Sequence, residues 1–589
     1  MAIKISRINK FFGGITHNDK SDIIGAALNV EELDIFTNPS FIQPETIFGS
    51  ESVSSPLTSV TSVGTTATAT STNQHGLTTN DSVTISGANE SAYNGTFTAT
   101  VTSGTVFTYT MLSDPVDTAT GTIVATYSTL RKVLGYTVDD SDTAYALSIS
   151  QDGDAIIWKL ASASATDPGS WVFLFESTLD AHPNGNIIWH KWDSGASYLY
   201  YPTVSGTTVS LKKLLISGPT ETTAAFNGTD VATLTGLDGT GDRIPMIRLN
   251  GELYIGNGKY IANVDDDGVV TLTNFTIALS TGWEVVDFDP IGDELMLLCR
   301  STEDSKNVSK IFFWDKTASS GSNDEINLPM GGPQIVVNHS EVIRVFCAKN
   351  GILRIYELLG KLPVEKHKLD SISTETSAQA IIPCQTKFIK DNILYFGLWK
   401  TDKAGLYAIG QAGPQLPVAL VLSRRFDTSA YTAHKPQAAT AFGNNFYLAF
   451  DDNGTADIAR IEGNNSPTRS SNAVYESVII DAGSPEYNKE WRGFILNAKS
   501  MPASCSITFD IRPDNVSAYD TNVAMALNST NDYVDVGGAS GMTADRFWYR
   551  ELTSVVGRLV QIKLTFASST TTMPVLYSLG IISEEQPLI

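Results

Sequence analysis

The chain has 589 residues, a formal net charge of −23 and an isoelectric point near 4.7. This charge repels nucleic acid and anionic membranes, so it argues against a protein that reads DNA sequence. Apolar residues make up 42% of the chain, which is enough to build real cores. We see no secretory leader after Met1 and no apolar run near the ~20 residues that span a bilayer. We therefore expect neither secretion by that route nor a membrane-spanning segment.

Residues 1–50 form the first predicted unit, a segment too short to bury much surface by itself. Isoleucines alternate with polar residues at its start, and Phe11-Phe12-Gly13-Gly14-Ile15 then breaks into a turn. Ala26–Phe36 is the best candidate for a short helix. We expect the segment to pack on a larger body, either its own chain or a neighbour.

Residues 51–127 form the second unit, which is rich in Thr, Ser, Gly and Val. No Lys or Arg occurs between Lys20 and Arg131. Short alternating stretches and the hairpin signal Asn94-Gly95 predict a small all-β module inserted ahead of the next domain.

Residues 128–465 form the third unit, in which a polar turn between apolar strands recurs roughly every 40 to 53 residues. The clearest copy is Arg243–Val270, where Asn250-Gly251, Asn257-Gly258 and Asp267-Gly268 separate apolar runs. The recurring turns are Gln151-Asp152-Gly153, Ser194-Gly195, Asn250-Gly251, Gly292-Asp293, His339-Ser340, Asp391-Asn392 and Gly443-Asn444-Asn445. Such a period with four short strands per repeat predicts a β-propeller of about seven blades, possibly six. The alternative is a stack of antiparallel sandwiches without closure.

Residues 473–589 form the last unit, behind a linker at Ser466–Ser471. Its strand candidates are Val474–Ile480, Gly493–Ala498, Ser506–Ile511, Leu559–Phe566 and Val575–Ile581. Apolar and polar residues alternate within Val560–Phe566, which gives this strand one buried and one solvent-exposed face. We interpret this unit as a β-sandwich of jelly-roll type, so that the predicted fold class is all-β throughout.

Four widely spaced cysteines give no disulfide framework, and we expect them to be free thiols in a protein that folds in a reducing cytoplasm. They are Cys299, Cys347, Cys384 and Cys505.

A propeller can be a glycosidase, which would need two carboxylates about 5 to 10 Å apart near its axis. The candidates are Glu284, Asp287, Asp289, Glu341 and Glu357. Turns at Ser150–Gly153 and Asp167–Trp171 only approximate a sialidase-type Asp-box. We assign no catalytic residue and predict that the chain is not an enzyme.

No cofactor motif and no metal site is predicted. The turns Asp265–Gly268 and Asp451–Gly454 with Asp457 lack the ligand spacing of a calcium loop. His182 and His190 lack metal-site spacing. The aromatic residues that could stack on sugar are more often core residues, and they are Trp399, Trp491, Trp548 and Tyr549.

Several segments resemble bacteriophage tail proteins. The module, with DSVTISG at Asp81–Gly87, YNGTFT at Tyr93–Thr98 and FTYT at Phe107–Thr110, looks like small β modules of virion proteins. Two further regions are similar to large phage tail proteins built on a propeller. They are LYIGNGKYIANV followed by Ser309–Asp315, and Val560–Phe566 with Pro574–Ile581.

The opening FFGGI, the later Asn29 and an extended Pro-containing segment resemble the entry strand of short-tail nozzle proteins. This chain departs from that family in its inserted module and its C-terminal sandwich.

The resemblance implies a structural component of the virion tail, a ring-forming nozzle or hub that forms part of the DNA-ejection conduit. Its expected partners are further copies of itself in a ring, the portal or adaptor, and tail fibres. Genomic DNA would pass without specific binding. The expected location is the virion, after synthesis in the host cytoplasm. Phe11, Phe12, Gly13, Gly14 and Ile15 are the predicted docking residues for the neighbouring tail ring.

Two alternatives remain open. The first is a tail-associated host-recognition protein, in which the module or the sandwich binds a host surface glycan. The second is a tail-associated glycosidase.

Overall fold

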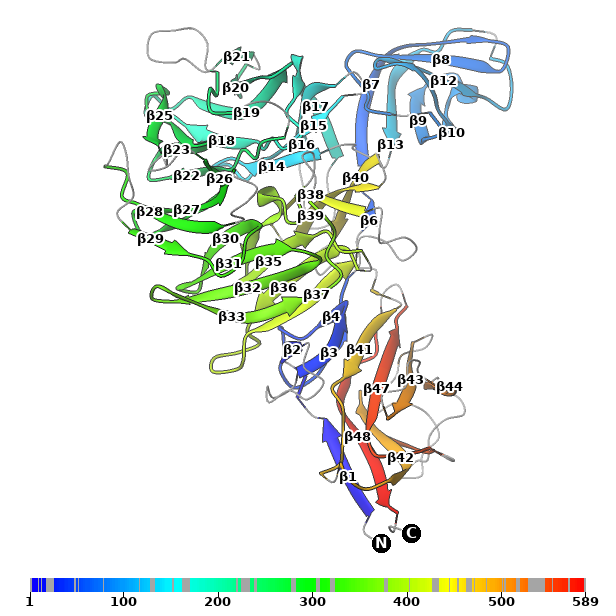
Figure 1. The fold of residues 1–589 in the computed structure, drawn as a ribbon. Helices are drawn as coiled ribbons and strands as arrows, with labels where there is room; N and C mark the ends of the chain where they lie inside the picture. Colours follow the sequence, from blue (N-terminus) through cyan, green and yellow to red (C-terminus); the bar gives the residue numbers. More distant parts are fainter. Residues whose placement is uncertain are drawn as a thin grey trace.

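A computed structural model shows that the chain folds almost entirely into β-strands, which confirms the all-β class (Figure 1). The structure describes residues 3–8, 10–11, 13–16, 26–46, 49–50, 52–77, 79–115, 117–127, 133–150, 153–161, 170–218, 221–223, 233–237, 241–276, 282–302, 308–317, 324–375, 380–401, 403–425, 434–443, 445–452, 455–461, 469–470, 472–483, 485–499, 502, 505–514, 520–527, 546–552, 555–569 and 572–586. Within these ranges the only helices are two single 3₁₀ turns, η1 (Ser91–Tyr93) and η2 (Cys384–Thr386). No helix in them is long and apolar enough to cross a membrane.

The central body is a β-propeller in which the described strands form seven four-stranded antiparallel units, here called blades one to seven. Blade one is β14 (Val133–Val138), β15 (Ala144–Ile149), β16 (Asp154–Ala161) and β17 (Ser170–Ala181), and blade two is β18 (Ile188–Lys191), β19 (Ser197–Ser205), β20 (Thr208–Leu215) and β21 (Glu221–Thr223). Blade three is β22 (Met246–Leu249), β23 (Glu252–Asn257), β24 (Tyr260–Val264) and β25 (Val270–Thr276), and blade four is β26 (Trp283–Ile291), β27 (Glu294–Ser301), β28 (Ser309–Trp314) and β29 (Asp324–Asn327). Blade five is β30 (Pro333–His339), β31 (Val342–Lys349), β32 (Ile352–Leu359) and β33 (Leu362–Leu369), and blade six is β34 (Phe388–Lys390), β35 (Ile393–Leu398), β36 (Gly405–Gly410) and β37 (Ala419–Arg425). Blade seven is β38 (His434–Phe442), β39 (Asn445–Asp452), β40 (Thr455–Ile461) and β6 (Gly49–Ser50).

The repeated turns join the first and second strands of blades two to seven. Positive φ angles at Asn250 and Gly251, and again at Asp391 and Asn392, give these tight turns the backbone that a two-residue hairpin requires. The copy at Gly153 is out of phase, because it joins β15 to β16 within blade one. Gln151 and Asp152 themselves lie outside the described residues.

The ring is closed by strands that are far apart in the sequence. The first strand of blade one, β14, packs against the first strand of blade seven, β38. The outer strand of blade seven is supplied by β6, in which Gly49 and Ser50 pair with Arg460 and Ala459 of β40. Blade seven is therefore shared between the N-terminal segment and the end of the repeat region.

The inserted module is attached to the outer edge of blade one. Its strands are β7 (Ser52–Val63), β8 (Thr66–Ser71), β9 (Ser82–Ala88), β10 (Gly95–Thr98), β11 (Thr100–Ser103), β12 (Val106–Thr110) and β13 (Gly121–Tyr127). The first part of β7 pairs in parallel with β17, and its later part pairs with β8. Buried Val60 and Phe107 belong to one continuous core with Trp158 of blade one and Tyr447 of blade seven.

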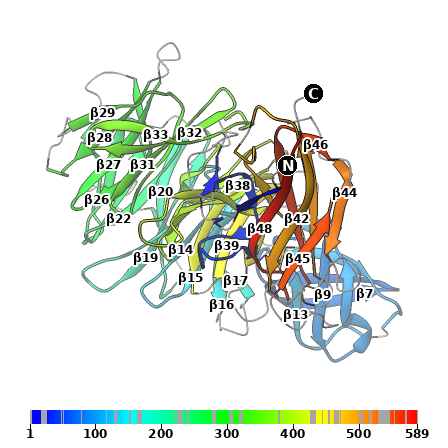
Figure 2. The ribbon, with the colours of Figure 1, turned by 90° about the horizontal axis from the view of Figure 1, so that it is seen from below.

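The C-terminal unit is a sandwich of two sheets. One sheet has the order β1 (Ile3–Ile8), β48 (Leu576–Glu585), β42 (Lys489–Ala498) and β45 (Arg546–Glu551), with β46 (Val556–Gly557) beside β42. The other has the order β3 (Ala26–Glu31), β41 (Ala473–Ser477), β47 (Val560–Ala567), β43 (Ser506–Pro513) and β44 (Asp520–Leu527). Stacked Phe494 and Phe509 join the two sheets. Seen from below, the sandwich and the blue module both lie to the right of the green blades (Figure 2).

The N-terminal segment contributes strands to both the sandwich and the propeller of its own chain. β1 completes one sandwich sheet, and the strand pair β2 (Gly14–Ile15) and β3 completes the other. The hairpin of β4 (Leu33–Asp34) and β5 (Gln43–Pro44) then leads to β6 in the propeller. As a result the two chain ends lie together at the tip of the sandwich (Figure 1).

The predicted helix at Ala26–Phe36 is wrong, because this stretch forms β3 and β4. Val30 and Leu33 are fully buried between the propeller and the sandwich. β3 pairs with β41 on one side and meets β37 at Glu31 on the other. Burial on both sides favours an extended strand over the weak helical pattern.

A buried charge cluster, the junction cluster, fastens the propeller to the sandwich. Arg425 of β37 binds Glu32 at 2.7 Å and lies 3.9 Å from Glu31. Arg424 binds Glu45 at 3.2 Å. Ser470, in the predicted linker, donates a 2.5 Å hydrogen bond to Glu32 and is itself buried.

Candidate functional site

The centre of the propeller is the natural place to look for a site, because the first strands of the blades line it. A set of polar residues, the axial cluster, lies there. Its members are Asn184, Arg243, Asp287, Gln334, Glu375, Gln385 and Lys387. Asp287 and Gln334 lie in the first strands of blades four and five, and the others lie in the connections that lead into blades two, three and six. They make bonds between blades that are not neighbours.

Arg243, just before blade three, binds blade five. Its guanidinium donates to the backbone and side-chain oxygens of Gln334, both at 3.0 Å, and pairs with Glu375 at 2.5 Å. Arg300 of blade four contacts the same carboxylate at 3.1 Å. Burial acts to raise the pKa of Glu375, but the two cations and Gln334 outweigh it and hold that pKa below its usual value. Glu375 therefore stays an anion that ties three blades together.

Lys387, just before blade six, binds blade four. Its ammonium donates to Asp287 at 2.6 Å and to the carbonyl oxygens of Phe288 and Val336. Asp287 also accepts the Val336 amide at 2.9 Å. Burial raises the pKa of Asp287 to about 6, against the opposing attraction of Lys387. Burial alone would lower the pKa of Lys387, but Asp287 and Asp289 raise it, so the ammonium stays charged.

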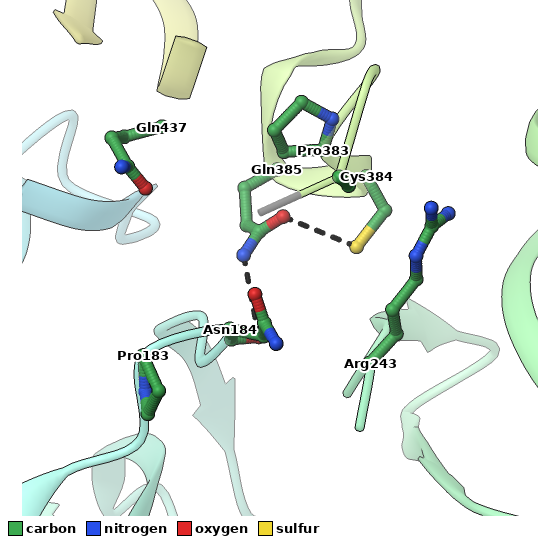
Figure 3. A pocket seen from close by; sticks show the side chains of 8 residues that line it. Pro183, Asn184, Arg243, Pro383, Cys384, Gln385 and Gln437 are labelled. Carbon is green, nitrogen blue, oxygen red and sulfur yellow. Dashed lines mark hydrogen bonds between the residues drawn. The ribbon is translucent and has the colours of Figure 1, made fainter. Parts of the chain in front are cut away.

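Gln385 bridges blades six and two across the axis. Its amide donates to the backbone oxygen of Asn184 at 3.3 Å (Figure 3). It also donates to the backbone oxygen of Gly185 at 3.0 Å. Gln385 and Asn184 line a pocket with Pro183, Arg243 and Gln437. The space inside it that is open to water is about 10 Å³, roughly the room of one water molecule. A sugar ring does not fit this space.

Cys384 also lines this pocket and donates to Gln385 at 3.3 Å (Figure 3). Burial raises the pKa of its thiol to about 12, so the reactive thiolate is absent at neutral pH. All four cysteines are free thiols in the structure, as predicted.

Four of the five carboxylates considered for glycoside hydrolysis have partners in the structure. Glu284 pairs with Arg300, Glu357 pairs with Arg344 at 2.9 Å, and Asp289 accepts the Asn338 amide at 2.8 Å. Asp287 pairs with Lys387 at 2.6 Å. Glu341 is exposed in the β30–β31 turn. The sequence offered no signal for Arg243, Gln334 or Lys387, because nothing local shows that these residues meet across the axis.

The predicted docking residues lie mostly inside their own chain. Phe11 is 1% exposed and packs edge-on against Tyr475 of the sandwich, with ring centres 5.3 Å apart. Gly13 and Gly14 are buried and Ile15 is half-buried, while Phe12 lies outside the described residues. A Cβ on Gly14 would come within 2.6 Å of the Leu420 amide nitrogen, so β2 needs glycine to lie against β37. Docking by these residues to a neighbouring ring stays a prediction.

The acidic turn at Asp265–Gly268 has a structural role in its hairpin. One Asp265 oxygen accepts the amides of Asp267 and Val269 at 3.1 and 2.7 Å. In the described part of the chain, no group of three or more His, Cys, Asp or Glu is placed to hold a metal ion. His182 and His190 are buried, and His190 contacts the Asp265 backbone oxygen at 3.1 Å.

Of the aromatic residues considered for sugar stacking, Trp491 is a core residue. Trp399 is half-buried, with the Lys435 ammonium 5.2 Å from its ring centre. The side chains of Trp548 and Tyr549 lie outside the described residues. A half-exposed pair that the sequence did not single out is Phe41 with Tyr577, edge-on at 6.1 Å.

Comparison with known proteins places the chain in no family. No family model and no curated protein matches it. Among solved structures it is similar to an exo-beta-1,3-galactanase from Phanerochaete chrysosporium with galactose, at 9% identity and a TM-score of 0.27 over 57% of this chain and 95% of that one. It is also similar to an Aleuria aurantia lectin in complex with Fucalpha1-6GlcNAc, at 12% identity and a TM-score of 0.28 over 50% of this chain and 96% of that one. Such likenesses concern the fold alone, and the resemblance to phage tail proteins stays a prediction.

The prediction that the chain is not an enzyme is corrected by this comparison. The similar structures include the galactanase and a putative 6-phosphogluconolactonase from Bacteroides uniformis, at 12% identity and a TM-score of 0.26 over 64% of this chain and 92% of that one. Two of the similar structures are thus named as enzymes, and the expectation that the chain is not an enzyme is withdrawn.

Proposed function

We propose that this chain is a structural component of a bacteriophage tail, which assembles with further copies into a ring around the path of the DNA. The observation that carries the proposal is the route of the N-terminal segment. Residues 3–50 supply strands to both sheets of the sandwich and the closing strand of the propeller.

This route makes one interlocked body out of two domains. Pulling the sandwich away from the propeller would have to break β-sheet pairing and the buried ion pairs of the junction cluster together. Domains joined only by a linker move freely by default, whereas this pair is coupled. Rigid coupling suits a wall that must keep its shape while the genome passes.

The closed axis and the charge fit the same role. The axial cluster occupies the centre of the propeller, so the DNA path would lie between copies of the chain and not through one propeller. A net charge of −23 per copy would keep DNA from adhering to such a path.

Electron cryo-microscopy of purified phage particles tests this proposal, because it locates the chain directly. We expect a closed ring of copies around the tail axis, near the portal. Copies that extend outward from the tail, or absence of the chain from the particles, would overturn it.

The second candidate function is recognition of a host glycan, which the half-exposed pair Phe41 and Tyr577 favours. Their rings present apolar surface beside the sandwich, and aromatic faces of this kind can stack on a sugar. The similar galactanase and lectin structures contain carbohydrate, and this candidate extends that property to the present chain.

A glycan array probed with the full chain and with the Phe41→Ala variant tests this second function. We expect a glycan that binds the natural chain and binds the variant at least tenfold more weakly. Analysis of the same glycans for cleavage products examines hydrolysis, the third possibility. Equal binding by both chains would exclude the aromatic pair as the site.

A further inference from the structure

The far end of the module carries two exposed apolar side chains. Val63 ends β7 and is 88% exposed, and Leu112 follows β12 and is 102% exposed. The two segments are adjacent, because the Met111 amide donates to the Thr65 oxygen at 2.8 Å. With exposed Asp114 and Asp117, Val63 and Leu112 form a surface that we name the module tip.

The module tip belongs to a region without positive side chains. Residues 51–127 contain five acidic residues and no Lys or Arg. An apolar surface in so acidic a region can approach another copy of this chain only where that copy is locally positive.

The hairpin between β32 and β33 of blade five offers such a place. Leu359 and Leu362 are 61% and 64% exposed. Residues 352–369 carry four basic residues (Arg354, Lys361, Lys366 and Lys368) against two acidic ones, Glu357 and Glu365. Glu357 pairs with buried Arg344 at 2.9 Å and lies 3.9 Å from Lys366. Lys361 pairs with Asp324 at 2.5 Å, but its side chain is 71% exposed and can still face a partner. We name the surface of Leu359, Lys361, Leu362 and Lys366 the basic hairpin.

The two surfaces lie on opposite sides of the molecule. The module is attached to blade one, and three blades separate blade one from blade five in one direction and two in the other. In Figure 1 the module lies at the upper right, and the β32–β33 hairpin lies at the left edge of the propeller. Complementary patches on opposite sides allow head-to-tail contact, the arrangement that generates closed rings when its rotation closes.

We propose that the module tip of one copy docks on the basic hairpin of a second copy of this chain. Val63 and Leu112 then cover Leu359 and Leu362, while Asp114 and Asp117 face Lys361 and Lys366. Closure of such a head-to-tail series into a ring rests on the proposed function. The contact between two copies does not depend on it.

Sedimentation velocity of the full chain over a range of concentrations tests the contact with two variants, Leu112→Asp on the module tip and Leu362→Asp on the basic hairpin. We expect each variant alone to associate at least tenfold more weakly than the natural chain. An equimolar mixture of the two should form one-to-one dimers and nothing larger, because only one pair of intact surfaces remains.

A charge exchange gives an independent readout. Lys361→Glu with Lys366→Glu should weaken association at least tenfold, and adding Asp114→Lys with Asp117→Lys to the same chain should restore it. Val269→Asp is the matched control, since it places a charge on another exposed aliphatic residue of the propeller and should leave association unchanged.

Three outcomes would overturn the proposal. They are a natural chain that remains monomeric, surface variants that associate like the natural chain, and a mixture without dimers. Normal association by the variants, together with a ring in phage particles, would remove this contact and leave the proposed function standing.

Discussion

Lys387 shows how much one side chain can depend on residues distant in sequence. Its ammonium reaches Asp287 across 100 positions of the chain and also binds two carbonyl oxygens. Both charged groups are largely out of water, with side chains 15% and 2% exposed. Removing one partner leaves the other as a buried charge without its main counter-charge.

We predict that Lys387→Met lowers the free energy of unfolding of the propeller by about 3 to 5 kcal/mol. Chemical denaturation followed by tryptophan fluorescence measures the change. The double variant with Asp287→Asn should recover part of the lost stability, because it also removes the carboxylate that Lys387→Met leaves without its counter-charge. Lys435→Met, which removes a more exposed amine 3.9 Å from Asp451, should change stability by less than about 1 kcal/mol.

His75 gives the module a pH dependence. The imidazole is fully buried, its Nδ1 accepts the Leu77 amide at 3.0 Å, and burial lowers its pKa to about 4. In the unfolded chain its pKa would be near 6.5, so between pH 6.5 and 4 the unfolded state binds the extra proton. Acid therefore favours unfolding of the module.

We predict that the free energy of unfolding of the module falls by about 3 kcal/mol from pH 7 to pH 4 on account of His75. Hydrogen exchange at the amides of β9, β12 and β13 measures this locally. In His75→Asn, which keeps a possible acceptor for Leu77, most of that pH dependence should vanish. The same slope in both proteins would refute the assignment.

At the scale of elements, the N-terminal segment has a structural function within its own chain. Phe11 enters the sandwich core beside Tyr475, and Gly14 lets β2 lie against the backbone of blade six. A deletion of Phe11–Ile15 would therefore disturb the sandwich, whatever it does to assembly.

We predict that Phe11→Ala lowers the free energy of unfolding of the sandwich by about 3 to 5 kcal/mol, through lost burial and the cavity left behind. Limited proteolysis and denaturant unfolding would reveal the loss. Ile5→Ala, on the exposed face of β1, should cost less than about 1 kcal/mol. Equal effects of the two substitutions would contradict the packing described for Phe11.

At the scale of the whole molecule, the junction cluster sets the angle between sandwich and propeller. Arg424 and Arg425 come from the last strand of blade six, and their acidic partners come from residues 31–45. The contact joins sheets as well as side chains, since Glu31 of β3 pairs with Leu422 of β37.

We predict that Arg425→Met, which removes the cation 2.7 Å from the buried carboxylate of Glu32, lowers the free energy of unfolding by about 3 to 5 kcal/mol and loosens the two bodies. Small-angle X-ray scattering should show a larger radius of gyration, and the sandwich should unfold before the propeller. Arg492→Met, which removes an exposed arginine 2.8 Å from Glu584, is the matched control and should leave both measurements unchanged. If the sandwich and the propeller of Arg425→Met unfold in a single shared transition, the junction cluster does not have this role.

Local pattern was sufficient for much of the fold. Alternating apolar residues and Asn-Gly turns predicted the strands of the blades and five strands of the sandwich, because strand periodicity and turn geometry depend on near neighbours in the chain. The same local criteria failed at Ala26–Phe36, where pairing with β41 and burial on both sides outweighed a weak helical pattern.

The sequence by itself determined that the chain is acidic, all-β and repetitive. Only the tertiary structure decided that β1 to β3 belong to the sandwich and β6 to blade seven, and that Arg243 and Lys387 close the axis. Contacts across hundreds of residues depend on how sheets stack and how a ring closes, and local composition does not encode these distances. The order of the blades in space likewise places the module tip and the basic hairpin on opposite sides of the molecule.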